Sequence, residues 1–110
     1  SAVRGARVMA KMPGHERYRI LKKAADLLEE RREDHARIIT LEEGKVIAEG
    51  RVEVDRAVQT LIGSAEEAKR IHGETVPLDG APSWSGQFGF TIRIPCGVVA
   101  AISRGVTLTR

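Results

Sequence analysis

Residues 87–103 read QFGFTIRIPCGVVAAIS and decide the fold of this chain. In the first half, apolar side chains at positions 88, 90, 92 and 94 alternate with polar or small ones, which is the period of a strand with one buried and one wetter face. Pro95-Cys96-Gly97 then predicts a turn, and residues 98–102 are apolar at every position. Such a run is typical of a strand covered on both faces inside a parallel α/β sheet.

The second of these strands lacks a sheet within this sequence. A parallel strand reaches its neighbour through a crossover of about a dozen or more residues, whereas eight residues follow Ile102. We therefore expect an incomplete α/β fold in which helices are followed by a pair of strands within residues 88–103. The chain is interpreted as a piece of a larger protein.

Helical periodicity precedes the strands throughout residues 1–73. Pro13 is well placed to open the second helix, and Gly44 to end it, because glycine adopts the left-handed conformation of a helix C-terminus without a Cβ penalty. A polar stretch around Glu33 predicts a bend within this helix. The expected helical segments are about residues 1–11, 13–43 and 46–72.

The third helical segment contains two glycines, Gly50 and Gly63. Each interior glycine costs a helix about 1 kcal/mol relative to alanine. Packing against neighbouring elements must therefore offset them, or the helix bends there. Residues 75–86, with two prolines and two glycines, are predicted to form a turn-rich loop before the strands.

Composition is that of an ordinary globular protein, with 42% hydrophobic and 30% charged residues. Aromatic residues make up only 4%, so most of the core must come from aliphatic side chains on helices that need partners. The sequence shows neither a charged-then-apolar leader nor a long apolar run, and it has one cysteine. These features favour a cytoplasmic protein without a membrane partner.

Positive charge is concentrated at one end of the chain. Residues 1–23 carry seven basic residues and one acidic residue, a net charge of +6, whereas the remaining 87 carry 11 basic and 14 acidic, a net charge of −3. A basic amphipathic start could bind nucleic acid, an anionic surface or a targeting receptor. Because Tyr18 is the only aromatic residue among these charges, we favour a solvated helix face and expect no nucleic-acid partner.

No residue of the sequence is a strong candidate for catalysis. Cys96 lies in a turn with no histidine near it in sequence and no helix N-terminus to lower its pKa. Gly44-Lys45 lacks the rest of a phosphate loop and reads as a helix terminus. The adjacent carboxylates of Glu42 and Glu43 read as a solvated pair rather than an acid/base dyad. Three histidines lie too far apart for metal-ligand spacing, at His15, His35 and His72.

The order and spacing of several segments resemble a known family. From Ala2 to Ser103, the sequence resembles the N-terminal part of the NAD(P)-dependent aldehyde dehydrogenase superfamily, whose members are several times longer. The segments that carry the resemblance are residues 17–31 (RYRILKKAADLLEER), Leu41-Glu42-Glu43-Gly44-Lys45, Glu53-Val54 with Arg56-Ala57, Gly73-Glu74 with Pro77, and residues 90–103 (FTIRIPCGVVAAIS).

The resemblance implies that the chemistry lies elsewhere in the family's sequence. The family's catalytic cysteine, glutamate base and cofactor loop come downstream of this region, so no catalytic residue is expected here and the chain alone is expected to be inactive. In the intact enzyme, an aldehyde would be oxidised to a carboxylic acid with NAD or NADP. The alternating strand would contribute to homo-oligomer contacts. Ile102 and Ser103 would border the nicotinamide side of the cofactor, although Ile102 could equally be a core residue.

The family pattern breaks after Ser103. Family members continue with proline, an aromatic residue and an asparagine whose amide helps to form the oxyanion hole, whereas this chain has Arg104, Gly105 and Val106. Valine cannot donate a hydrogen bond to a developing oxyanion. We therefore expect residues 1–103 to form the family-like region and 104–110 to be a frameshifted or divergent tail.

Two other functional classes stay open. One is a free-standing helical oligomerisation module without enzymatic activity, and the other is a basic nucleic-acid-binding piece. The module predicts a cooperative melt with one discrete mass, whereas an incomplete dehydrogenase predicts a broad melt or aggregation through an unpaired apolar strand. Nucleic-acid binding would weaken steeply with salt.

Overall fold

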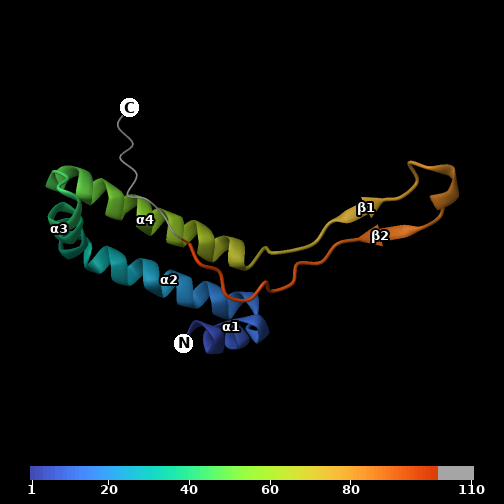
Figure 1. Ribbon diagram of the computed structural model, residues 1–110, viewed down its shortest axis with the longest axis horizontal. Coiled ribbons are helices and arrows are strands. Elements are labelled where there is room, and N and C mark those ends of the chain that lie inside the picture. Colours follow the sequence, from blue (N-terminus) through green and yellow to red (C-terminus); the bar gives the residue numbers. More distant parts are fainter. Residues whose placement is uncertain (102–110) are drawn as a thin grey trace.

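The computed structural model describes residues 1–101, so Ile102, Ser103 and residues 104–110 lie outside the described part. Three of the four helices pack into an elongated layer, the first helix lies to one side of it, and a long hairpin arm projects from one end (Figure 1). The elements in order are α1 (Ala2–Lys11), α2 (Gly14–Glu30), α3 (Arg32–Glu43), α4 (Ile47–Ala68), β1 (Thr75–Pro77), the 3-10 helix η1 (Pro82–Trp84) and β2 (Phe88–Phe90).

The helices begin and end close to where the sequence predicts. Pro13 is the N-terminal capping residue of α2, and Gly44 ends α3 with a φ of 73°, in the left-handed region. The predicted bend near Glu33 is a break at Arg31, which separates α2 from α3. The third predicted segment, about residues 46–72, corresponds to α4, which ends earlier than predicted, at Ala68. Local capping and helical periodicity were sufficient for these assignments because both act within a few residues of the chain.

The fold class of helices followed by a strand pair is confirmed, but the bounds of the strands differ from the prediction. Regular strand structure at 88–94 is confined to β2, and its partner is β1, which lies in the stretch predicted as a loop. The two strands are antiparallel, with Thr75 opposite Phe90 and Pro77 opposite Phe88. The loop that joins the two strands therefore comprises residues 78–87 and contains η1.

Residues 91–101 form no regular strand, which corrects the expected strand at 98–102 over its described part. Gly97 has a φ of 92°, in the left-handed region, but residues 95–97 form no regular turn, which corrects the turn predicted there. The run that follows is extended and exposed, with Val99 72% accessible. The physical reason is that an all-apolar strand is stabilised by sheet neighbours on its edges and layers on its faces, and residues 1–101 supply neither.

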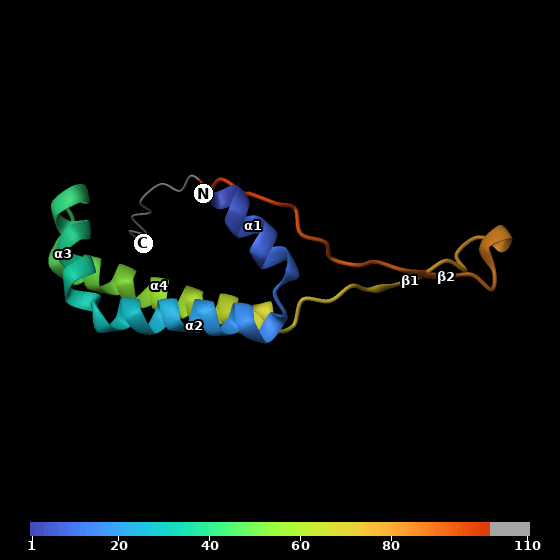
Figure 2. The same cartoon turned by 90° about the horizontal axis from the view of Figure 1, so that it is seen from below.

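Small side chains make up the core between α2, α3 and α4. Figure 2 shows α2 and α4 running side by side along the layer, with α3 across one end. The largest fully buried side chain among the described residues is Val54 of α4. The other buried apolar residues are Ala25, Ala36, Val58, Ala65 and Ala68. Such a core buries little apolar area per residue, so the layer depends on close backbone approach and on polar contacts.

Two glycines permit the close approach. A Cβ on Gly50 of α4 would lie 2.8 Å from the carbonyl oxygen of Ala36 in α3. At the other end of α4, a Cβ on Gly14 would lie 2.8 Å from the carbonyl oxygen of Ala68. Lys69 adds a cation–π contact there, with its Nζ 4.0 Å from the centroid of the Tyr18 ring. Each end of α4 is thus held against a neighbouring helix.

Ion pairs join α3 to α4 on the surface of the layer. Arg32 donates to Asp55 at 2.7 Å, and Arg51 donates to Glu33 at 2.9 Å. The hydrogen bond from Arg32 lowers the pKa of Asp55 below its ordinary value, and the hydrogen bonds from Arg51 lower the pKa of Glu33. Both carboxylates are therefore held in the charged form by a cation of the other helix.

These pKa shifts predict acid sensitivity of the helical layer. Because the folded-state pKa of Asp55 lies below its unfolded value of about 3.9, its contribution to stability is complete above that pH and is lost as the pH falls through the folded-state pKa. Urea unfolding followed by circular dichroism at several pH values should show a smaller acid-induced loss of stability in Asp55→Asn than in the unaltered chain.

A charge-matched control is available in the hairpin. Asp79 lies in the loop after β1, is exposed, and makes no ion pair among residues 1–101. Asp79→Asn should therefore keep the acid dependence of the unaltered chain. If Asp55→Asn and Asp79→Asn show the same dependence on pH, the Arg32–Asp55 pair does not stabilise the contact between α3 and α4.

Candidate functional site

The residues that sequence analysis singled out do not form one site. Ile102 and Ser103, expected beside the nicotinamide, lie outside the described residues. Cys96 is a free, exposed thiol in the segment that follows the hairpin. Among residues 1–101, no three His, Cys, Asp or Glu side chains gather as metal ligands. No helix in the same range is long and apolar enough to cross a membrane.

Lys45 is a structural residue at the end of α3, as the helix-terminus interpretation of Gly44-Lys45 predicts. Its ammonium group lies 2.7 Å from Glu43 and also pairs with Glu53 of α4, and its side chain is 9% exposed. These two carboxylates, Glu43 foremost, raise the pKa of Lys45. With both partners in place, the lysine ties α3 to α4 and its charge is already neutralised.

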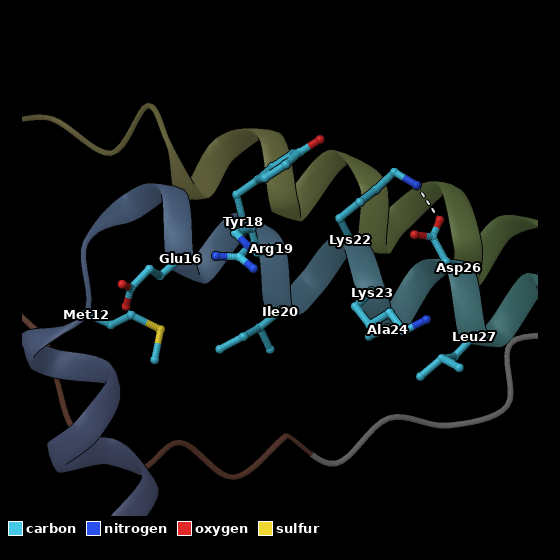
Figure 3. A pocket seen from close by; sticks show the side chains of 10 residues that line it. All are labelled: Met12, Glu16, Tyr18, Arg19, Ile20, Lys22, Lys23, Ala24, Asp26 and Leu27. Atoms are coloured by element: carbon cyan, nitrogen blue, oxygen red, sulfur yellow. Dashed lines mark hydrogen bonds and ion pairs between the residues drawn. The ribbon is translucent and has the colours of Figure 1, made fainter.

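An open groove follows α2 and encloses about 760 Å³. Figure 3 shows Met12, Ile20 and Leu27 on the side of α2 that faces away from α4, with charged side chains around them. Ile20 is 49% exposed and Leu27 is 36% exposed. An apolar floor with a charged rim is the composition of a surface that another polypeptide segment covers. We name this surface the α2 groove.

The hairpin arm exposes a second apolar surface. Phe88 and Phe90 of β2 are 76% and 66% exposed, and their ring centroids lie 6.0 Å apart. Ile92 and Ile94 continue the same alternation at 69% and 76% exposure. A two-stranded hairpin of this kind is marginally stable by itself and acquires stability by packing against another surface.

A third surface is cationic and lies where the arm leaves the helices. It is a groove of about 680 Å³ between the first turns of α2, the chain after α4 and the returning segment at 92–95. Its polar side chains are Arg17, Arg70, His72 and Arg93, and its other lining residues are Ile71, Gly73, Ile92, Ile94 and Pro95. We name this surface the cationic groove. Sequence analysis missed it because its arginines come from three separate segments of the chain.

Comparison with known proteins places this arrangement in one family. The sequence profile of the aldehyde dehydrogenase family matches residues 1–103. The 3-sulfolactaldehyde dehydrogenase of Priestia megaterium is 56% identical over 89 residues, which are 81% of this chain and 19% of that protein. Aspartate-semialdehyde dehydrogenase 1 of Pseudomonas canavaninivorans is 42% identical over 99 residues, covering 90% of this chain and 21% of that protein.

The fold agrees with this placement. Aldehyde dehydrogenase 21 of Physcomitrella patens, whose crystal structure contains the reaction product succinate, superimposes on 81% of this chain with a TM-score of 0.70 and 40% sequence identity. The match covers 18% of that protein's chain. The chain thus spans about a fifth of the length of the curated relatives it matches, in their N-terminal region. Because the family profile matches residues 1–103 and the fold superimposes on 81% of the chain, this chain belongs to the aldehyde dehydrogenase family.

Proposed function

We propose that this chain forms the N-terminal helical layer and hairpin arm of an NAD(P)-dependent dehydrogenase that oxidises an aldehyde to a carboxylic acid. The observation that carries the proposal is the family match over residues 1–103. The aldehyde substrate and the NAD or NADP cofactor belong to the intact enzyme. Homo-oligomer formation and a cytoplasmic location are part of the same proposal, as is the absence of nucleic-acid and membrane partners.

In this enzyme, the chain would act as scaffold. The α2 groove would be covered by the cofactor-binding part of the protein, since its exposed apolar side chains need a partner layer. Phe88 and Phe90 on the arm would contact another subunit. Residues 98–103 would enter the cofactor sheet, where Ile102 and Ser103 are proposed to border the nicotinamide. The cofactor supplies the hydride acceptor, and the described residues hold the layer and the arm in place.

A chimeric enzyme tests the proposal. Residues 1–103 would replace the aligned N-terminal segment of the Priestia megaterium 3-sulfolactaldehyde dehydrogenase, to which this chain is 56% identical. We expect the chimera to reduce NAD(P)+ with 3-sulfolactaldehyde at a rate within about tenfold of the parent enzyme, equivalent to about 1.4 kcal/mol in activation free energy. The parent enzyme lacking its own segment should be inactive.

The result that would contradict the proposal is a chimera with the parent's mass and cofactor affinity but no activity. If the chimera does not fold, the 110-residue chain would be co-expressed with the shortened parent, and the absence of restored activity would then count against the proposal. The helical oligomerisation module is the second candidate function, favoured by the exposed phenylalanines of the arm. A cooperative melt with one discrete mass for the chain alone would support the module.

A further inference from the structure

The cationic groove concentrates positive charge without a compensating carboxylate in its lining. Arg17, Arg70 and Arg93 line it together with His72, and no Asp or Glu is among its lining residues. The contact between α3 and α4 differs from this groove, because both of its arginines, Arg32 and Arg51, pair with a carboxylate. Several guanidinium groups around one cavity repel one another unless an anion lies between them.

Arg17 supplies a hydrogen-bond donor that lacks an acceptor. Its Nε atom is enclosed within the protein, and no residue among 1–101 accepts a hydrogen bond from it. An enclosed donor without an acceptor is costly, and the planar guanidinium group suits the paired oxygens of a carboxylate, sulfonate or phosphate. Arg17 lines the cationic groove, so an oxyanion there would meet its guanidinium group and offset its charge.

The other arginines leave donors for the same anion. His72 is already engaged, because its Nδ1–H donates to the carbonyl oxygen of Arg70 at 2.6 Å and Nε2 of the neutral ring is an acceptor. Arg70 pairs with Glu67, but both side chains are more than 60% exposed, so water weakens that pair and the guanidinium can be shared. Arg93 has no ion-pair partner among the described residues.

The walls of the groove decide what kind of anion fits. Ile71, Ile92, Ile94 and Pro95 contribute apolar surface beside the arginines, and the volume of about 680 Å³ lies in the range of small-molecule sites. A bare inorganic ion would leave this surface wet. We propose that the cationic groove binds a small organic oxyanion, with its charged head between Arg17 and Arg93 and its carbon chain against the isoleucines. This proposal does not depend on the proposed dehydrogenase function.

Nuclear magnetic resonance of the labelled 110-residue chain tests it, with butanesulfonate, inorganic sulfate and butanol as probes at constant ionic strength. Butanesulfonate should cause saturable shifts of the amides at 70–73 and 92–95. It should bind at least about threefold more tightly than sulfate, because its carbon chain removes apolar surface from water. Butanol should not saturate. Shifts spread over all basic segments, or equal binding of butanol, would overturn the proposal.

Two variants of equal charge sharpen the test. Arg93→Gln should weaken butanesulfonate binding by about tenfold or more, through the loss of a charged hydrogen bond. Arg93 lies in an exposed, irregular segment, so its replacement leaves the helices intact. Arg4→Gln removes the same charge from α1, outside the groove, and should bind as the unaltered chain does. Equal weakening of butanesulfonate binding in both variants would refute the site. So would the absence of saturable binding to the unaltered chain and to Arg4→Gln.

Discussion

Gly50→Ala is expected to destabilise the helical layer, whereas Gly63→Ala in the same helix is expected to stabilise it. Both positions lie inside α4, where alanine is favoured over glycine by about 1 kcal/mol. Their surroundings differ. A Cβ at position 50 would lie 2.8 Å from the carbonyl oxygen of Ala36 and 3.3 Å from Oγ1 of Thr40, whereas a Cβ at position 63 meets nothing within 4 Å.

The backbone of α3 decides the sign at position 50. The carbonyl oxygen of Ala36 is part of a helix and cannot rotate away as a side chain does, so α3 and α4 must separate. Overpacking of this kind costs about 1–3 kcal/mol, which outweighs the gain in helix propensity. Separation would also stretch the ion pairs of Arg32 with Asp55 and of Arg51 with Glu33.

Urea unfolding of the two variants and the unaltered chain, followed by far-ultraviolet circular dichroism, measures the effect. Gly63→Ala should unfold at a higher urea concentration than the unaltered chain, and Gly50→Ala at a lower one. Because the two variants make the same chemical change in one helix, propensity cancels between them. Equal stabilisation of both would mean that α3 does not pack on α4 at Gly50.

Gly73→Ala is expected to open the base of the hairpin arm. A Cβ at this position would overlap the carbonyl oxygen of Thr91 and lie 2.6 Å from the Thr91 carbonyl carbon. Both neighbours are backbone atoms, so the two segments must move apart. The contact that they make consists of the Thr91 amide donating to the Glu74 carbonyl at 2.8 Å and the Glu74 amide donating to Oγ1 of Thr91 at 2.9 Å.

The loss of both hydrogen bonds together with the steric conflict should destabilise the base of the arm by about 2–3 kcal/mol. Nuclear Overhauser contacts between Glu74 and Thr91, present in the unaltered chain, should disappear. In the chimeric enzyme, the same substitution should lower activity by about tenfold or more, equivalent to at least about 1.4 kcal/mol. It redirects the segment that leads into the proposed cofactor strand.

Gly80 provides the matched control for this substitution. It lies in the loop of the same arm, and a Cβ there meets nothing within 4 Å. Gly80→Ala should therefore keep the contacts between Glu74 and Thr91 and the activity of the chimera. Retention of those contacts in Gly73→Ala would show that the arm is not closed at its base by this glycine.

The sequence by itself determined the helices, most of their ends and the family, while α4 ends at Ala68, before the predicted end near residue 72. Pro13 and Gly44 act through the φ values that their own backbones allow, and the apolar spacing of each helix repeats within a few turns. The break at Arg31 was predicted, within two residues, from a polar stretch alone. Resemblance to aldehyde dehydrogenases rested on the order of short segments, and the family match over residues 1–103 confirms it.

Only the tertiary structure decided which distant segments meet. The partner of Phe88–Phe90 is a three-residue strand, Thr75–Pro77. The sequence did not predict this strand, because it contains a proline and lies beside a turn-rich segment. Gly50 and Gly63 have the same helix propensity, but only Gly50 is required by the close approach of α3. The division at residue 103 and the roles of Ile102 and Ser103 stay predictions, because they fall beyond the described residues.

The cationic groove illustrates the same limit. In sequence, Arg17 belongs to a basic stretch at the start of the chain, and Arg93 is one polar position of an alternating strand. They line one groove because the hairpin brings residues 92–95 back to the first turns of α2. Charge and periodicity along a chain are local properties. The spatial neighbours of a side chain depend instead on how distant segments fold together, which is determined by packing.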